Sequence, residues 1–135
     1  MNTLDCLVYT SRAKLGGSEQ HAALADIIKV SAHLNERAGI SGILTMQDGY
    51  FIQLLEGAPA SLDLLMIHLH FDERHDNISI VARETISTRD VTGWSMIGPD
   101  AKVPPHPVLS QLLAAPSPNI RPWREAMIEL LGVPA

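Results

Sequence analysis

Residues 35–57 read NERAGISGILTMQDGYFIQLLEG, and this stretch decides the fold of the chain. Two apolar runs, over residues 40–46 and 50–56, predict two strands. Between them, Gln47-Asp48-Gly49 contains the Asp-Gly pair that is typical of a tight hairpin turn. Gly39 suits the position just beyond the end of a preceding helix. We therefore expect a helix that leads into a β-hairpin.

Two side-chain amides in this stretch occupy positions where the hydrophobic pattern predicts burial. Gln53 lies between Phe51 and Leu55 on one strand face, and Asn35 lies on the apolar stripe of the preceding helix. A buried amide without hydrogen-bond partners costs about 1–3 kcal/mol. The two amides therefore suggest a polar ligand inside an otherwise apolar fold.

The composition is that of a single folded domain. The 135 residues are 46% hydrophobic, and no apolar run approaches the roughly 18 residues that span a bilayer. The net charge of −5 argues against nucleic acid as the main partner, because phosphate binding requires a basic surface. The N-terminus lacks the basic segment of a signal peptide. We expect a cytoplasmic protein with no membrane and no nucleic-acid partner.

The other expected elements follow from the same patterns. They are a strand over residues 4–11, a helix from about Ser18 to Arg37, a helix from Pro59 with the core stripe Leu62, Leu65, Met66 and Leu69, a polar loop over residues 72–77, strands over residues 78–86 and 91–97, and two short helices over residues 107–115 and 122–131.

This order, β-α-β-β-α-β-β followed by helices, predicts the ferredoxin-like arrangement. We expect an α+β fold with a mixed five-stranded sheet, two helices on one face and the C-terminal helices on the other. Residues 1–100 are expected to form the main domain, and residues 101–135 a helical extension that packs on the sheet. The first and third strands are central neighbours in this arrangement.

A candidate site follows from the pairing of these two strands. Tyr9 on the first strand, Gln53 on the third, and Ser31 and Asn35 on the first helix converge on the helix-covered side of the sheet. A phenol and two amides offer hydrogen-bond donors and acceptors but no charge at neutral pH. Such a set suits a neutral, planar ligand such as a flavin ring. On spacing alone, a polar network that only ties the helix to the sheet is the commoner explanation.

The sequence gives little support for a metal site or a catalytic site. His68 and Asp72 are four residues apart with His70 and His75 nearby, but a solvated helix flank explains them better than a metal site. Cys6 is expected to be a small buried core thiol rather than a nucleophile. The sequence contains no phosphate-binding loop, dinucleotide fingerprint or serine nucleophile motif. We therefore expect no metal and no enzymatic activity.

Several motifs, in matching order and spacing, resemble the BLUF family of blue-light receptors that bind FAD. The resemblance covers about residues 3–100 and rests on LVYTSRA in the first strand, on the run from Asn35 through AGISGIL and DGYFIQLLEG, on DERH after the second helix and on GWSM in the fifth strand. It implies a short, stand-alone photoreceptor with FAD as its cofactor, and a flavin-binding domain at residues 1–100.

The resemblance also implies roles for individual residues. Tyr9 and Gln53 match the photoactive tyrosine and glutamine, and Asn35 matches the asparagine that holds the imide edge of the flavin. The remaining matches are Ser31 near the ring, Asp72, Arg74 and His75 near the ribityl and phosphate part, and Trp94 and Met96 as the output pair. Light is then expected to drive electron and proton transfer from Tyr9, after which the Gln53 amide returns rotated or tautomerised.

One residue departs from the family pattern. Leu34, directly before Asn35, occupies a position where similar proteins commonly carry Asn or His. This departure leaves open a second function, a ferredoxin-like interaction or ligand-binding module that no longer binds flavin. In the leading interpretation, the protein is a photosensor that forms homo-oligomers and changes its contacts with an unidentified downstream signalling protein.

Overall fold

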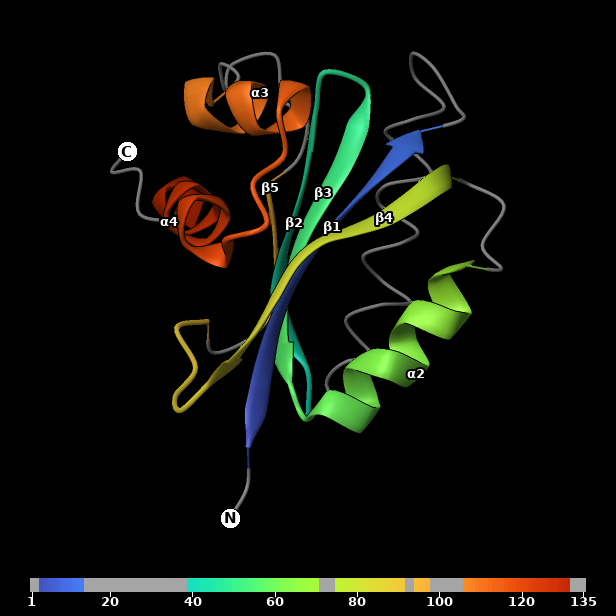
Figure 1. The fold of residues 1–135 in the computed structure, drawn as a ribbon, viewed down its shortest axis with the longest axis vertical. Coiled ribbons are helices and arrows are strands. Elements are labelled where there is room, and N and C mark those ends of the chain that lie inside the picture. The colour runs from blue at the N-terminus through green and yellow to red at the C-terminus, as the bar shows by residue number, and fades with distance from the viewer. Residues whose placement is uncertain (1–2, 14–38, 71–74, 92–93, 98–105, 132–135) are drawn as a thin grey trace.

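The computed structural model describes residues 3–13, 39–70, 75–91, 94–97 and 106–131 (Figure 1). Their elements are, in chain order, β1 (Leu4–Ala13), β2 (Ser41–Gln47), β3 (Tyr50–Gly57), α2 (Pro59–His70), β4 (His75–Ile86), β5 (Trp94–Ile97), α3 (Pro107–Ala114) and α4 (Ile120–Leu131). The helix expected from about Ser18 to Arg37 lies outside the described residues. None of the described helices is long and apolar enough to cross a membrane.

The strands form one mixed sheet in the order β4-β1-β3-β2-β5. Neighbouring strands are antiparallel except β2 and β5, which are parallel. β1 and β3 therefore lie side by side in the interior of the sheet, as the ferredoxin-like arrangement requires. The predicted α+β class is confirmed.

Strand alternation divides the core into two clusters on opposite faces of the sheet. Leu7 of β1 belongs to a cluster with Leu62 of α2, whereas the adjacent Val8 belongs to a cluster with Trp123 of α4. Figure 1 shows α2 on one side of the sheet and α3 and α4 on the other. The prediction that the C-terminal helices pack on the opposite face from α2 is therefore confirmed.

The hairpin turn has the geometry that its sequence predicts. Asp48 and Gly49 have φ values of 54° and 82°, so both central residues adopt left-handed conformations. Gln47 and Tyr50 close the turn as register partners. Two central residues with positive φ are typical of a type I′ turn, whose twist matches that of paired strands. The turn thereby fixes the register of β3, on which Gln53 lies.

The side chain of Gln47 holds α3 against the hairpin. Its Nε2 donates to the carbonyl oxygen of His106 at 2.9 Å and to Ser110 Oγ at 2.7 Å. Its Oε1 accepts from the backbone N–H of His106 at 2.8 Å. Ser110 Oγ also donates to Asp48 Oδ2 at 2.9 Å. The start of α3 is therefore joined to the turn by hydrogen bonds from both ends of one amide.

The start of β4 differs from the prediction. β4 begins at His75 instead of residue 78, so the expected polar loop is wrong for residues 75–77. His75 pairs with Ala13, and Asp76 pairs with Arg12, at the end of β1. Backbone pairing with a long neighbouring strand extends β4 through polar residues that lack a strand pattern of their own.

The start of β5 also differs from the prediction. β5 begins at Trp94, and Val91, which was expected to open this strand, lies outside it. The backbone N–H of Val91 donates instead to Glu56 Oε1 at 2.7 Å. The N–H of Val91 is therefore bonded to the buried carboxylate of Glu56 and not to a neighbouring strand.

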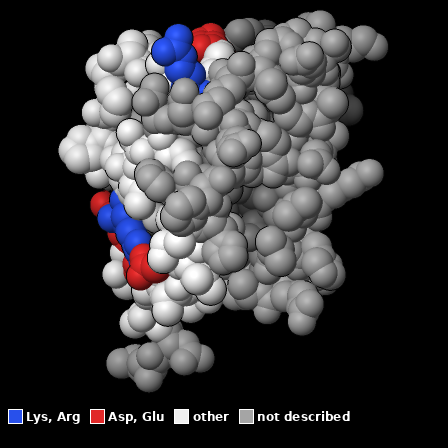
Figure 2. Space-filling view, turned by 90° about the vertical axis from the view of Figure 1, so that its right-hand side faces the viewer, with Lys and Arg blue, Asp and Glu red and all other residues white. Residues whose placement is uncertain are grey.

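Charged side chains also attach α2 to the sheet. Arg83 of β4 binds Asp5 of β1 at 2.8 Å and Asp63 of α2 at 2.6 Å, and it donates to the carbonyl oxygen of Pro59. On the face shown in Figure 2, blue and red atoms of the described residues lie next to each other in two small groups. The described part of that face carries no extended basic patch.

Replacing Gln47 tests whether the C-terminal helices are part of the folded unit. Gln47→Ala removes all the hydrogen bonds between this amide and the start of α3, so the free energy of unfolding should fall by about 1–3 kcal/mol. Urea denaturation measures this change, with the exposed Gln111→Ala on α3 as the matched control. Equal stability of the two variants would contradict the assigned role of Gln47.

Candidate functional site

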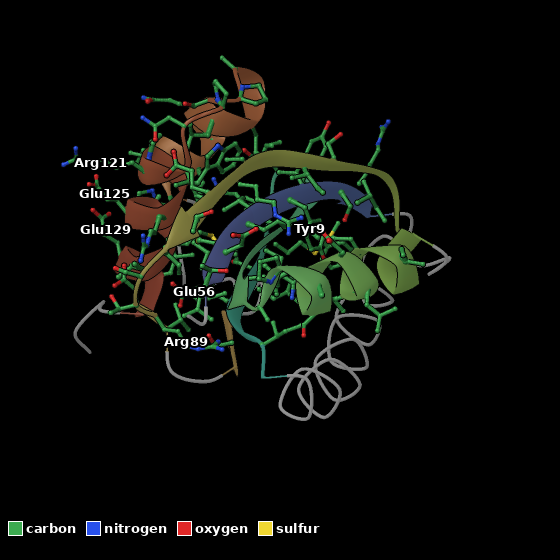
Figure 3. All side chains as sticks on the ribbon, turned by 60° about the horizontal axis from the view of Figure 1, so that its bottom comes forward. Tyr9, Glu56, Arg89, Arg121, Glu125 and Glu129 are labelled. Atoms are coloured by element: carbon green, nitrogen blue, oxygen red, sulfur yellow. The ribbon has the colours of Figure 1, made fainter. Side chains whose placement is uncertain are left out.

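Tyr9 and Gln53 lie directly opposite each other on the two interior strands. They are register partners in the antiparallel pairing of β1 and β3. Tyr9 is 1% exposed and Gln53 is 2% exposed. Tyr9 belongs to the core cluster that includes Leu62 of α2, and Figure 3 shows it on that side of the sheet. The convergence predicted for these two residues is therefore present in the strand register.

A row of register partners extends from this pair to both edges of the sheet. Gln53 pairs with Leu44 of β2, and Leu44 pairs with Met96 of β5. On the other side, Tyr9 pairs with Ile80 of β4. Met96 is therefore separated from Gln53 by one strand, and Leu44 is the residue between them.

The pairing of β1 with β4 is interrupted at Tyr9. Val8 pairs with Ala82 but Tyr9 pairs with Ile80, so Val81 is an extra residue on β4. Such a bulge bends and twists the strand locally and is common beside functional sites. The bulge shifts the register of β4 against β1 by one residue, at the position where Tyr9 faces Gln53.

The carbonyl oxygen of the Gln53 side chain is buried and has no hydrogen-bond partner among the described residues. An unsatisfied buried carbonyl costs about 1–3 kcal/mol of folding free energy. Buried polar groups without partners are uncommon, and each one calls for a physical reason. A ligand that donates a hydrogen bond to this oxygen would supply that reason.

The surroundings of this pair are apolar. Leu44, the register partner of Gln53 on β2, is 1% exposed. Phe51, on the same face of β3 as Gln53, is 2% exposed. Leu7 and Leu55 continue the same face and pack with α2. The site therefore combines a phenol and an amide, both neutral at pH 7, with apolar walls.

Several predicted site residues cannot be placed in this site. Ser31, Asn35, Asp72 and Arg74 lie outside the described residues, and so does Leu34. The structure therefore leaves their proposed contacts as predictions.

Three further predicted residues are placed by their backbones. His75 is the first residue of β4 rather than a loop residue. Trp94 and Met96 of β5 are the register partners of Gly42 and Leu44 on β2. The two predicted output residues thus occupy alternate positions beside the strand that adjoins β3.

Cys6 lies on the opposite face of the sheet and is fully buried. Burial, with a further contribution from the Glu56 carboxylate, raises the pKa of its thiol from 9.0 to about 12. A neutral buried thiol is a poor nucleophile, so the prediction of a core thiol is confirmed. Within the described residues, no group of three or more His, Cys, Asp or Glu side chains could hold a metal ion.

A second buried polar group on β3, Glu56, was not predicted from the sequence. Glu56 is 0% exposed and accepts hydrogen bonds from the backbone N–H groups of Asp90 and Val91. Glu56 shares a face of β3 with Ile52 and Leu54, since the three are every second residue of the strand, so strand periodicity alone could have predicted a buried position.

A family model confirms the relationship that the motifs suggested. The model described as BLUF, sensors of blue-light using FAD, matches residues 4–97. The chain belongs to the BLUF family. The predictions of a blue-light sensor and of FAD as its cofactor are therefore confirmed at the level of the BLUF family.

Individual BLUF-containing proteins are similar to this chain over part of their length. The alpha subunit of photoactivated adenylate cyclase from Euglena gracilis is 32% identical over 73 residues, which are 54% of this chain and 7% of that protein. The corresponding beta subunit is 28% identical over 90 residues, which are 67% of this chain and 10% of that protein. The chain therefore spans a tenth or less of the length of these curated relatives.

Solved BLUF structures share the fold. The dark-state structure of the BLUF protein BlrB is 31% identical, with a TM-score of 0.65 over 73% of this chain and 74% of that chain. The photo-activated structure of BlsA has a TM-score of 0.75 over 98% of this chain and 96% of that chain. At 20% identity, the likeness to BlsA concerns the fold alone.

The described residues of this BLUF chain fit a flavin on chemical grounds. The ring system of FAD is planar, and its edge carries both hydrogen-bond donors and acceptors. Gln53 presents a buried carbonyl oxygen without a partner among the described residues, and Leu44 and Phe51 supply apolar surface on the same face.

The unpaired carbonyl of Gln53 gives a stability prediction for the flavin-free protein. Gln53→Leu keeps the volume of the side chain and removes the unsatisfied group, so the free energy of unfolding should stay the same or rise by up to about 1–3 kcal/mol. Urea denaturation of the flavin-free protein measures this change.

Gln47→Leu is the matched control for this substitution, because the Gln47 amide is hydrogen-bonded through both its oxygen and its nitrogen. The control should lose about 1–3 kcal/mol. If Gln53→Leu loses as much stability as Gln47→Leu, the Gln53 carbonyl is not an unsatisfied group.

Proposed function

We propose that this BLUF chain senses blue light through Tyr9 and Gln53 and signals by changing its contacts with another protein. The observation that carries this proposal is the buried side-chain oxygen of Gln53, which has no partner among the described residues and lies on the register position opposite Tyr9. A side-chain amide has a donor end and an acceptor end of nearly equal shape. It can therefore reverse its hydrogen bonds without disturbing the packing around it.

The residues of the chain perform the hydrogen-bond switch. Bound FAD would supply the group that absorbs blue light and, once excited, is a strong electron acceptor. The Tyr9 hydroxyl group holds a proton that can pass to the amide of its neighbour Gln53. The electron and the proton then return to Tyr9, and the amide is left rotated or tautomerised, with Oε1 and Nε2 in exchanged hydrogen-bonding roles. The apolar walls at Leu44 and Phe51 keep water from substituting for either partner.

The residues that would hold FAD come from several elements. The proposed set is Ser31, Asn35, Gln53, Asp72, Arg74 and His75, within a flavin-binding domain at residues 1–100 and with a helical extension at residues 101–135. His75 begins β4, the strand whose Ile80 pairs with Tyr9, and its inclusion rests on the family motif. The other contacts rest on the family motifs.

The proposed output begins at β5. Trp94 and Met96 pair with β2 beside the row that contains Gln53, so a change at the amide has a short path to this edge strand. The output is a light-dependent contact with a downstream signalling protein, or a change in a homo-oligomer, in the cytoplasm. The chain itself performs no enzymatic step in this proposal.

Replacing Tyr9 with phenylalanine removes the proton donor and keeps the ring. Tyr9→Phe should bind FAD and remain yellow, but its absorption should show none of the red shift that blue light produces in the parent protein. Absorption spectra before and after illumination make this measurement. A normal light-induced red shift in Tyr9→Phe would rule out this mechanism.

Replacing Gln53 with leucine removes the switch itself. Gln53→Leu should bind FAD with slightly lower affinity, about five-fold for one hydrogen bond, and should show no red shift. Gln111→Leu, an exposed change of the same kind on α3, should behave like the parent protein. A full red shift in Gln53→Leu would show that the amide is not the switch.

A further inference from the structure

The carboxylate of Glu56 fixes the segment that leads into β5 to the end of β3. Glu56 Oε1 accepts from the backbone N–H of Val91 at 2.7 Å. The N–H of Asp90 lies 3.1 and 3.0 Å from the two carboxylate oxygens. A carboxylate that is fully removed from water requires such bonds, because an unpaired buried charge is strongly destabilising. The segment is therefore held firmly at this point.

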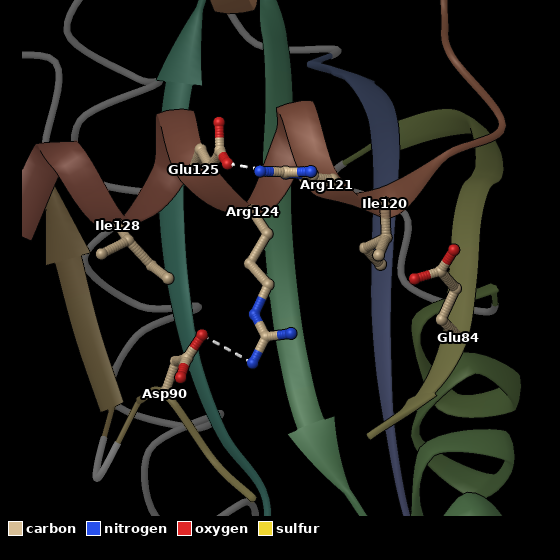
Figure 4. Close-up of a pocket in the computed structure, with 7 residues that line it drawn as sticks. All are labelled: Glu84, Asp90, Ile120, Arg121, Arg124, Glu125 and Ile128. Carbon is tan, nitrogen blue, oxygen red and sulfur yellow. Dashed lines mark hydrogen bonds and ion pairs between the residues drawn. The ribbon is translucent and has the colours of Figure 1, made fainter. Parts of the chain in front are cut away.

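Arg124 of α4 reaches the same carboxylate. Its Nη2 lies 3.5 Å from Glu56 Oε2 and 2.6 Å from Asp90 Oδ2. Figure 4 shows the side chain extending from α4 toward Asp90. The Nε atom of Arg124 is buried and has no partner among the described residues. The guanidinium group thus leaves part of its donor capacity unused in this arrangement.

Arg89, one residue before Asp90, also bonds this segment to β2 and to the end of β3. Its Nη1 donates to the carbonyl oxygen of Glu56 at 2.7 Å and to Ser41 Oγ at 2.9 Å. Its Nη2 donates to the carbonyl oxygen of Gly39. Figure 3 shows Glu56 and Arg89 at the same end of the sheet. Both the side chain and the backbone of Glu56 are therefore bonded to residues 89–91.

A cavity of about 380 Å³ adjoins Arg124 (Figure 4). Its lining includes Asp90 and, on β4, Glu84, together with the apolar side chains of Ile120 and Ile128. Side chains in a close-packed core need free volume before they can change position. The cavity leaves such volume beside the guanidinium group of Arg124, and Glu84 at its edge is a third carboxylate besides Glu56 and Asp90.

We propose that Glu56 and Arg124 are positioning residues that carry the light signal from β3 to α4, an inference that rests on the proposed role of Gln53. Glu56 follows Gln53 by three residues in the same strand, and its carboxylate is bonded to residues 90–91 just before β5. A displacement of β3 relative to β5 therefore acts directly on this carboxylate. Arg124 transmits it, because its Nη2 contacts both Glu56 and Asp90.

The unequal contacts of Arg124 with Asp90 and Glu56 make its position sensitive to small displacements of β3. The guanidinium group is close to Asp90 at 2.6 Å and distant from Glu56 at 3.5 Å. A small relative shift of the two carboxylates changes which of them Arg124 binds more strongly. Small shifts at packed interfaces produce discrete rearrangements, since packed elements have few alternative positions. The discrete change here is in the docking of α4.

Hydrogen exchange of the α4 backbone amides, followed by mass spectrometry in darkness and under blue light, tests this inference. In the parent protein, light should change α4 exchange by at least about five-fold, the lower end of ordinary coupling between two sites. Glu56→Gln and Asp90→Asn should keep the light-induced red shift of the flavin and lose this change in α4. Asp90 is 45% exposed, so its variant should fold even if the Glu56 variant does not.

Arg121→Gln is the matched control. It removes an arginine from the same helix, but its side chain is 80% exposed and pairs with Glu125 rather than with the sheet. This control should keep the full light-induced change in α4. A full α4 response in Asp90→Asn and Glu56→Gln would overturn the inference, and so would a parent protein that shows the red shift without any α4 response. Loss of the red shift in the parent protein would instead contradict the proposed function.

Discussion

The antiparallel register between β1 and β3 is the constraint on which the site depends. It places Tyr9 directly opposite Gln53 in the interior of the sheet. Side chains alternate between faces along a strand, so a shift of one residue would turn Gln53 away from Tyr9 and into the core beneath α4. The turn at Asp48-Gly49 fixes β3 against β2, and the pairing of β3 with β1 then fixes the two photoactive candidates against each other.

The buried polar groups on the two faces of β3 differ in whether their hydrogen bonds are satisfied. Gln53 faces the α2 side with a carbonyl oxygen that has no partner among the described residues, whereas Glu56 faces the α4 side and is bonded to two backbone N–H groups and approached by Arg124. A satisfied buried group rigidifies a structure, and an unsatisfied one marks a place where a ligand can bind. One strand therefore connects the candidate cofactor site on one face with a fixed attachment of α4 on the other.

Local patterns in the sequence predict the central part of this structure, and long-range pairing decides the rest. The hairpin follows from Asp48-Gly49, and the common face of Tyr9 and Gln53 follows from strand alternation, because both signals are contained within a few neighbouring residues. The start of β4 at His75 depends on pairing with the end of β1, which lies far away in the sequence. The partners of Glu56 could not be predicted for the same reason, since Arg124 comes from a helix near the other end of the chain.

Light-minus-dark infrared spectroscopy of protein containing glutamine labelled with ¹³C at the side-chain carbonyl tests the central claim most directly. The Gln47 amide is bonded through both of its ends to α3 and should contribute little to the difference spectrum. We expect a carbonyl band of the difference spectrum to move with the label, because the Gln53 oxygen changes its hydrogen bond when the flavin is excited. A difference spectrum that does not change with the label would contradict the assignment of Gln53 as the light-driven switch.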